Sequence, residues 1–161
     1  MGSNLTTGAA GDRNAQNMRV ALVCGRFNDV IVGQLAESAR EVFVECGVFV
    51  DDIHTVWVPG AWEIPMAAAA LARSGRFDAI VGVGAVIRGE TYHFDVIADQ
   101  SAAGLMRVAL DTGVVVANAI LTLENEEQAR ARVKGGAAGD KGAEAAYAAI
   151  ETANAIRASV F

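Results

Sequence analysis

Cysteine is scarce in this sequence, acidic residues outnumber basic ones, and no apolar run is long. The two cysteines, Cys24 and Cys46, have the spacing of neither a metal site nor a disulfide framework, so both are expected to be buried thiols. The net charge of −6 comes without a basic block, which argues against a nucleic-acid surface. No apolar run reaches the ~18 residues of a membrane span, and no basic-then-apolar leader opens the chain. These absences predict a soluble, cytoplasmic protein with no nucleic-acid or membrane partner.

The length and composition of the chain favour one folded domain. The 161 residues suffice for one full-sized core, and the hydrophobic content of 53% excludes disorder over most of the length. Residues 1–17 differ, because they are polar and rich in Gly, Ala, Ser and Asn. We expect them to be a mobile arm or a cloning remnant, and residues 18–161 to be the single domain.

From residue 18 onward the chain alternates between strand-like and helix-like patterns. Apolar runs predict strands at 18–24, 53–60, 77–87 and 114–123. Apolar residues at helical spacing predict helices at 31–47, 64–75, 95–113, 125–133 and 141–160. Strands joined by helices form a parallel sheet with helices on both faces. The predicted fold is therefore a three-layer α/β/α sandwich around a four-stranded parallel sheet, of flavodoxin type.

Polar and aromatic residues gather after three of the predicted strands. The first strand is followed by "GRFN" at 25–28, the second by "PGAWEIP" at 59–65, and the third runs into "VIRGETYHFD" at 86–95. The loops at the opposite ends of the strands are plain Gly, Asp and Ser turns. Since ligands of such sheets bind outside the carboxyl ends of the strands, we expect one site at this edge.

Two of these residues have both a structural and a functional interpretation. Phe27 could plug the end of the core, or its ring could stack on a flat heterocycle. Glu63 could be a first-turn acid favoured by the helix dipole, or a carboxylate that accepts hydrogen bonds from ligand hydroxyl or N–H groups.

The third loop suggests proton transfer and phosphate binding. His93 precedes a predicted helix, and imidazole is suited to proton transfer near neutral pH, although a purely structural role is the alternative. Glu90 and Thr91 open that helix, where free backbone N–H groups can bind a phosphate. Thr91 could instead be only a helix cap. Arg132 lies in a charged stretch that would ordinarily be a solvated helix face.

Five motifs in this order and spacing resemble the lumazine synthase family of riboflavin biosynthesis. They are "GRFN", "VPGAWEIP", "GAVIRGETYHFD", "ILTLENEEQARAR" and "GDKG", and the similarity runs from about residue 18 to 158. The resemblance implies condensation of 5-amino-6-ribitylaminouracil with 3,4-dihydroxy-2-butanone 4-phosphate. The products are 6,7-dimethyl-8-ribityllumazine, phosphate and water, and neither a cofactor nor a metal takes part.

The resemblance also implies a role for each site residue. His93 would transfer protons, Glu90 and Thr91 would bind the phosphate through main-chain N–H groups, and Arg132 would clamp it with assistance from Lys141. The pyrimidine and ribityl chain would contact Phe27, Ala61, Trp62, Glu63, Ala85, Val86, Ile87 and Asn118. Asn118 stands where many members have an aromatic ring, so its amide would bond the ring edge instead.

The family resemblance further implies ring-shaped pentamers, which in some members build a sixty-subunit shell. Each active site would then draw Asn118, Arg132 and Lys141 from a neighbouring chain. The stretch between Arg132 and Lys141 is slightly longer than in some members, which favours a free pentamer. Two alternatives of other classes stay open on the residues alone: a flavin- or lumazine-binding carrier without turnover, and a purely structural shell protein.

Overall fold

The computed structural model describes residues 8–160 and contains one four-stranded parallel sheet. The strands lie in the order β2-β1-β3-β4, which matches the first four strands of the flavodoxin order. Their bounds are β1 Val20–Gly25, β2 Ile53–Val58, β3 Ala79–Ile87 and β4 Val115–Leu123. The helices are α1 Asp29–Glu45, α2 Ile64–Arg73, α3 His93–Thr112, α4 Glu126–Arg130 and α5 Lys141–Val160, with 3₁₀ turns η1 Val50–Asp52 and η2 Ala61–Glu63.

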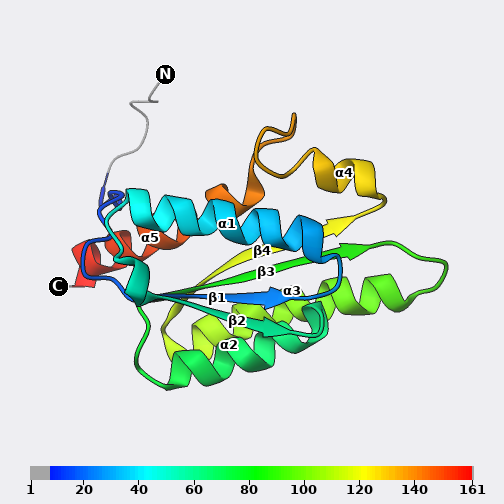
Figure 1. Cartoon of the computed structure of the whole chain (residues 1–161). Helices are drawn as coiled ribbons and strands as arrows, with labels where there is room; N and C mark the ends of the chain where they lie inside the picture. The colour runs from blue at the N-terminus through cyan, green and yellow to red at the C-terminus, as the bar shows by residue number, and fades with distance from the viewer. Residues whose placement is uncertain (1–7, 161) are drawn as a thin grey trace.

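Helices cover both faces of the sheet (Figure 1). α1 and α5 pack on one face over a core that includes Leu22, Phe43 and Ile150. α2 and α3 pack on the other face over Val23 and Ile80. The inner strands β1 and β3 are buried over nearly their whole length, as expected for parallel strands covered on both sides. The predicted three-layer α/β/α sandwich is confirmed.

The predicted elements all exist, but four helices differ from their predicted bounds, and the smallest difference is at α2, which ends at Arg73 rather than at 75. α1 begins at Asp29, two residues before the predicted start, because Asn28 adopts a left-handed conformation (φ 61°) that turns the chain directly into the helix. α3 likewise begins two residues early, at His93. α4 ends at Arg130 rather than near 133, and the chain then turns through Gly135 and Gly139, both at positive φ.

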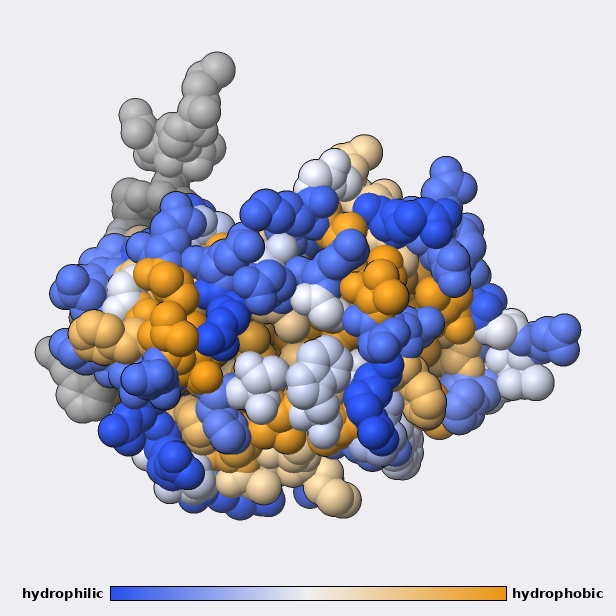
Figure 2. Space-filling view, viewed as in Figure 1, coloured by the Kyte–Doolittle hydropathy of each residue, from blue (hydrophilic) through white to orange (hydrophobic). Residues whose placement is uncertain are grey.

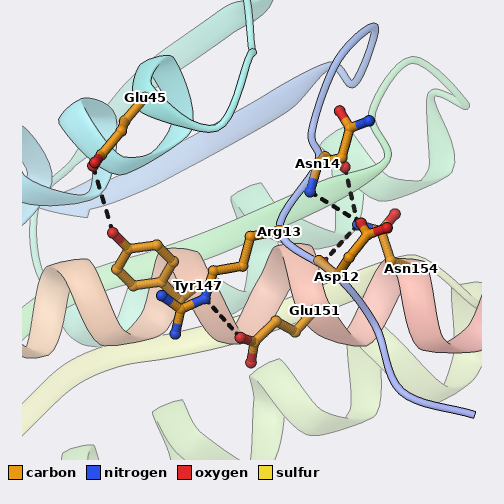
Figure 3. A network of polar contacts seen from close by, with 7 residues as sticks. All are labelled: Asp12, Arg13, Asn14, Glu45, Tyr147, Glu151 and Asn154. Carbon is orange, nitrogen blue, oxygen red and sulfur yellow. Dashed lines mark hydrogen bonds and ion pairs between the residues drawn. The ribbon is translucent and has the colours of Figure 1, made fainter.

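Residues 12–14 contact α5 (Figure 3), and Ala15 N donates to Cys46 O at the end of α1 at 2.8 Å. The guanidinium of Arg13 lies 3.9 Å from the centroid of the Tyr147 ring, and its Nε donates to Glu151 at 2.8 Å. Asn154 Nδ2 donates to the carbonyl oxygens of Asp12 and Asn14, both at 2.9 Å. The side chains of Ala15 and Met18 are buried in the core.

These contacts can be compared with the prediction that residues 1–17 form a mobile arm. Residues 1–7 lie outside the described residues. Over residues 12–17, the hydrogen bonds and buried side chains favour a fixed segment rather than a mobile one. Polar composition alone suggested mobility, but this segment has partners distant in sequence, on α5 and at the end of α1.

The expectation of buried thiols is confirmed for Cys24 and is wrong for Cys46. Burial in the middle of the sheet raises the pKa of the Cys24 thiol to about 12, so it stays protonated at neutral pH. Cys46 is half-buried, and burial together with the nearby Glu45 also raises its pKa. Within residues 8–160, no helix has the length and apolar character to cross a membrane. The cytoplasmic location stays a prediction.

Close packing of α5 on α1 depends on a glycine. A Cβ added at Gly142 would lie 2.2 Å from the carbonyl oxygen of Leu35 in α1. Gly142→Ala is therefore expected to lower the free energy of unfolding by about 1–3 kcal/mol, the usual cost of overpacking. This loss would exceed the roughly 1 kcal/mol that alanine otherwise gains over glycine inside a helix.

Gly33 in α1 is the matched control, because a Cβ there would meet nothing within 4 Å. Gly33→Ala is expected to raise the free energy of unfolding by about 0.5–1 kcal/mol. Urea denaturation of both variants measures the difference. A shift in the same direction for both would show that α1 and α5 are not held in backbone contact at Gly142.

Candidate active site

The loops after β1, β2 and β3 meet at one edge of the sheet and enclose a cavity of about 600 Å³. In Figure 1 this edge lies at the arrowheads of the strands. The cavity is lined by Phe27, Asn28, Gly60, Ala61, Trp62, Glu63, Ala85, Val86, Ile87, Gly89, Thr91, His93, Phe94, Val96 and Ile97. Because all strands are parallel, their carboxyl-end loops converge at this edge and form the walls of this cavity.

Most of the predicted site residues line this cavity. Nine of them do so: Phe27, Ala61, Trp62, Glu63, Ala85, Val86, Ile87, Thr91 and His93. Glu90 lies in the same loop as Thr91, is exposed, and does not line the cavity. Asn118, Arg132 and Lys141 also do not line it.

Phe27 presents its ring to the cavity rather than to the core. The side chain is 68% exposed, so it does not plug the end of the sheet. The turn is fixed by two backbone hydrogen bonds, from Arg26 N to Val58 O at 2.8 Å and from Phe27 N to Pro59 O at 3.1 Å. The ring lies so close to Gly60 that a Cβ there would come within 2.5 Å of Phe27 Cδ2. Backbone contacts on one side thus leave the ring accessible for stacking.

Glu63 has the local structural role that was one of its two interpretations. Its Oε2 accepts a hydrogen bond from the backbone N–H of Gly60 at 3.1 Å and so caps η2. Within the described residues the carboxylate has no other hydrogen-bond donor. Glu63 lines the cavity, and its carboxylate can accept more than this one hydrogen bond, so capping and ligand binding are compatible.

The loop at 88–92 leads from β3 into α3. His93 is the first residue of α3 and is exposed. Its backbone N–H donates to Thr91 Oγ1 at 3.3 Å, but the N-cap residue of α3 is Tyr92, so the alternative role of Thr91 as the helix cap is wrong. The backbone N–H groups of Glu90 and Thr91 donate to no acceptor within residues 8–160. Free N–H groups before a long helix are suited to an anion.

The other three predicted residues have partners outside the cavity. Asn118 lies on the edge strand β4, and its Oδ1 accepts from Ile120 N at 2.8 Å. Arg132 Nη1 donates to Gln128 O at 2.9 Å, and Lys141 Nζ pairs with Glu144 at 2.9 Å. The backbones of Arg132 and Lys141 are joined by a 3.0 Å hydrogen bond from Lys141 N to Arg132 O. The structure therefore places the backbones of these two residues side by side, away from their own chain's cavity.

Several cavity residues were not predicted: Asn28, Gly60, Gly89, Phe94, Val96 and Ile97. Asn28 Nδ2 donates to Ala85 O at 2.9 Å and so ties the first loop to the end of β3. No local pattern indicates that bond. Ile97 could have been found from the sequence, because it lies four residues after His93, a spacing that places both on one helix face. Within residues 8–160, no cluster of three or more His, Cys, Asp or Glu could hold a metal.

This fold and cavity define a class: flavodoxin-type α/β proteins that bind small molecules at the carboxyl ends of their strands. Comparison with known proteins identifies the family within that class. The model of the 6,7-dimethyl-8-ribityllumazine synthase family matches residues 17–157, and the chain belongs to this family. The resemblance noted in the sequence is confirmed.

Relatives with the same name align over most of the chain. The 6,7-dimethyl-8-ribityllumazine synthase of Paraburkholderia phymatum is 47% identical over 141 residues, which cover 88% of this chain and 79% of the relative. That of Burkholderia multivorans is 48% identical over 137 residues, which cover 85% of this chain and 77% of the relative. These names support the synthase activity expected from the sequence, and none favours a carrier without turnover.

Proposed function

We propose that this chain condenses 5-amino-6-ribitylaminouracil with 3,4-dihydroxy-2-butanone 4-phosphate to 6,7-dimethyl-8-ribityllumazine, phosphate and water. This is a transferase reaction of riboflavin biosynthesis, and it uses no cofactor. The observation that carries the proposal is the convergence on one cavity of an exposed aromatic ring, a carboxylate and an imidazole, from Phe27, Glu63 and His93. These are the groups needed for a flat heterocycle, a polyol chain and proton transfer.

The pyrimidine half of the site is supported by the loops after β1 and β2 and by the end of β3. Phe27 stacks on the ring, and Ala61, Trp62 and Glu63 bind the ribityl chain and ring edge, with Glu63 as the hydroxyl acceptor. Ala85, Val86 and Ile87 provide backbone groups at the carboxyl end of β3. Binding of both substrates in one cavity converts their encounter into an effectively intramolecular reaction.

The phosphate half of the site is formed by the loop before α3. Glu90 and Thr91 bind the phosphate with the backbone N–H groups that have no protein acceptor among the described residues. His93 lies two residues further on and moves protons as the amine of one substrate attacks the ketone of the other. Arg132 and Lys141 supply positive charge to the phosphate, and Asn118 contacts the ring edge; all three come from a neighbouring subunit.

The proposed assembly is a pentamer with its sites between neighbours. Two observations support an oligomer. Arg132 and Lys141 do not line their own chain's cavity, and large apolar side chains are exposed on α2 and α3, including Met66 at 82% and Leu110 at 76%. Figure 2 shows further apolar patches near both ends of the sheet, separated by polar side chains.

The stretch 133–140 favours the free pentamer over the sixty-subunit shell. Sedimentation tests this choice, because the masses of the two assemblies differ about twelvefold.

Turnover of the two substrates is the direct test of the proposed function. The purified chain is mixed with both substrates, and the absorbance of the lumazine product is followed with time. Multiple turnovers per chain are expected. Binding of product or flavin without any turnover would favour the carrier alternative.

Phe27 offers a test of the stacking role. Phe27→Ser is expected to weaken pyrimidine binding by roughly 1 kcal/mol or more, the scale of a lost aromatic pair. Because the side chain is 68% exposed, the melting temperature should stay near that of the parent chain. Calorimetric titration with the pyrimidine substrate and thermal melts measure the two effects.

Phe49→Ser is the matched control, since Phe49 is also mostly exposed, at 65%, but precedes η1 at the opposite end of the sheet. It should leave pyrimidine affinity unchanged. A large drop in the melting temperature of Phe27→Ser with retained binding would instead assign Phe27 to the core.

A further inference from the structure

Arg88 joins three elements around loop 88–92, the loop proposed to bind the phosphate. Its backbone N–H donates to Leu123 O at 2.8 Å and extends the pairing of β3 with β4. Its guanidinium donates from Nε to Glu124 at 2.8 Å and from Nη1 to Asp95 at 3.1 Å. A third hydrogen bond, from Nη2 to the other Asp95 oxygen, measures 3.4 Å. One side chain thus links the end of β3, the end of β4 and the first turn of α3.

The segment between Arg88 and Asp95 carries the reactive part of the cavity, yet it has little packing of its own. Gly89, Glu90, Thr91 and Tyr92 are all exposed. A Cβ added at Gly89 would meet nothing within 4 Å. The loop is consequently held mainly at its two ends, and the Arg88–Asp95 pair joins those ends directly.

The guanidinium also contacts a cavity wall. Its Cζ lies 4.3 Å from the centroid of the Phe94 ring, and Phe94 lines the cavity next to His93. A cation at this distance attracts the face of the ring. Arg88 therefore holds the first residue of the loop in place and also contacts the start of α3.

A direct role in phosphate binding does not suit the charges around Arg88. Its positive charge faces the two carboxylates of Asp95 and Glu124, so the three side chains together carry a negative charge. Their hydrogen bonds raise the pKa of the guanidinium and use its Nε, Nη1 and Nη2 donors. An anion would have to compete with both carboxylates for the same donors.

We propose that Arg88 is a positioning residue of the active site. Held by Asp95 and Glu124, it fixes loop 88–92 so that the N–H groups of Glu90 and Thr91 and the imidazole of His93 face the cavity together. The inference rests on the proposed function, since it assigns Arg88 to the same reaction. Surface ion pairs add little to global stability. Loss of this pair should therefore change the conformation of loop 88–92 but leave the melting temperature nearly unchanged.

Kinetics of Arg88→Lys and Glu124→Gln test the assignment. Lysine keeps the charge but lacks the planar fork that reaches both carboxylates. Each variant is expected to lower kcat/KM for the butanone phosphate by about tenfold or more, as small misplacements of a site do. KM for the pyrimidine should change much less. The double variant should be little worse than the poorer single one, because both changes break the same contact.

The sign of the Glu124→Gln effect separates positioning from direct binding. If Arg88 were itself a phosphate ligand, removal of a competing carboxylate would free it and lower KM for the butanone phosphate, which would overturn the inference. Arg107→Lys is the matched control, because the Arg107–Asp111 pair at 3.3 Å is also an exposed arginine–aspartate pair on α3. It should leave the kinetics unchanged.

Amide hydrogen exchange over residues 88–96 gives a readout independent of turnover. Exchange should be faster in Arg88→Lys and Glu124→Gln than in the parent chain and Arg107→Lys. Unchanged exchange or unchanged kinetics in both variants would overturn the positioning role. Absence of turnover in the parent chain would instead refute the proposed function, and the exchange measurement would still test whether Arg88 fixes the loop.

Discussion

Replacement of His93 by alanine is expected to lower kcat by roughly 10²-fold, the lower end of what a positioned acid–base group contributes. KM for both substrates should change far less, because proton transfer belongs to the transition state rather than to binding. The structure supports this expectation by placing His93 on the cavity wall, at the first residue of α3, with its backbone N–H bonded to Thr91. Steady-state kinetics with each substrate varied in turn measure the effect.

The second histidine provides the matched control for this prediction. His54 lies on the edge strand β2 with its ring stacked on Phe77, the ring centroids 5.8 Å apart, and does not line the cavity. His54→Ala should leave kcat unchanged. If His93→Ala retained kcat within about threefold of the parent chain, a difference below 1 kcal/mol in the barrier, His93 would not be the proton-transfer residue.

The fold could be predicted because the apolar pattern of the sequence indicates which strands are buried, and the alternation of strands and helices indicates the type of sheet. The continuous apolar run at 77–87 predicts a strand covered on both faces, and β3 is the inner strand buried by helices on both sides. Strands that alternate with helices favour a parallel sheet, in which the carboxyl-end loops lie at one edge. That rule alone places Phe27, Glu63 and His93 at one edge before any coordinate is known.

Features that depend on distant partners could not be predicted. Residues 12–17 have the composition of a mobile segment, whereas hydrogen bonds to Glu151 and Asn154 on α5 and to Cys46 at the end of α1 favour a fixed one. Asn28 would be assigned to an ordinary turn, whereas its amide bonds Ala85 on another strand. Gly60 matters because the Phe27 ring occupies the space of its missing Cβ. In each case the decisive contact joins segments that no local pattern relates.

For Asn118, Arg132 and Lys141, the roles could not be predicted for a different reason. Their proposed roles come from the family resemblance, and a single chain gives them other partners, Ile120 N, Gln128 O and Glu144. A site divided between two subunits cannot be read from the sequence or the fold of one. It requires an experiment on the assembly.

Such an experiment is available because the proposed site takes His93 from one chain and Arg132 from its neighbour. His93→Ala and Arg132→Ala should each be nearly inactive, the first through lost proton transfer and the second through lost phosphate binding. Equal amounts of the two variants, unfolded together and refolded, should form mixed rings. About a quarter of their interfaces would then hold both native residues, because the two choices around a closed ring are independent. Recovered activity should therefore approach roughly a quarter of the parent value.

The control distinguishes a shared site from a site within one chain. Arg132→Ala co-refolded with a chain that carries both substitutions can form no interface with both native residues, since neither partner supplies Arg132, and it should stay inactive. Mass spectrometry of intact rings verifies that mixing has occurred. If verified mixed rings of the two single variants show no more activity than the variants alone, His93 and Arg132 do not meet across an interface.

The same test can be extended to Lys141, because its backbone N–H is hydrogen-bonded to Arg132 O at 3.0 Å. Because the proposed site takes Arg132 and Lys141 from the same neighbouring chain, Lys141→Ala should complement His93→Ala but not Arg132→Ala.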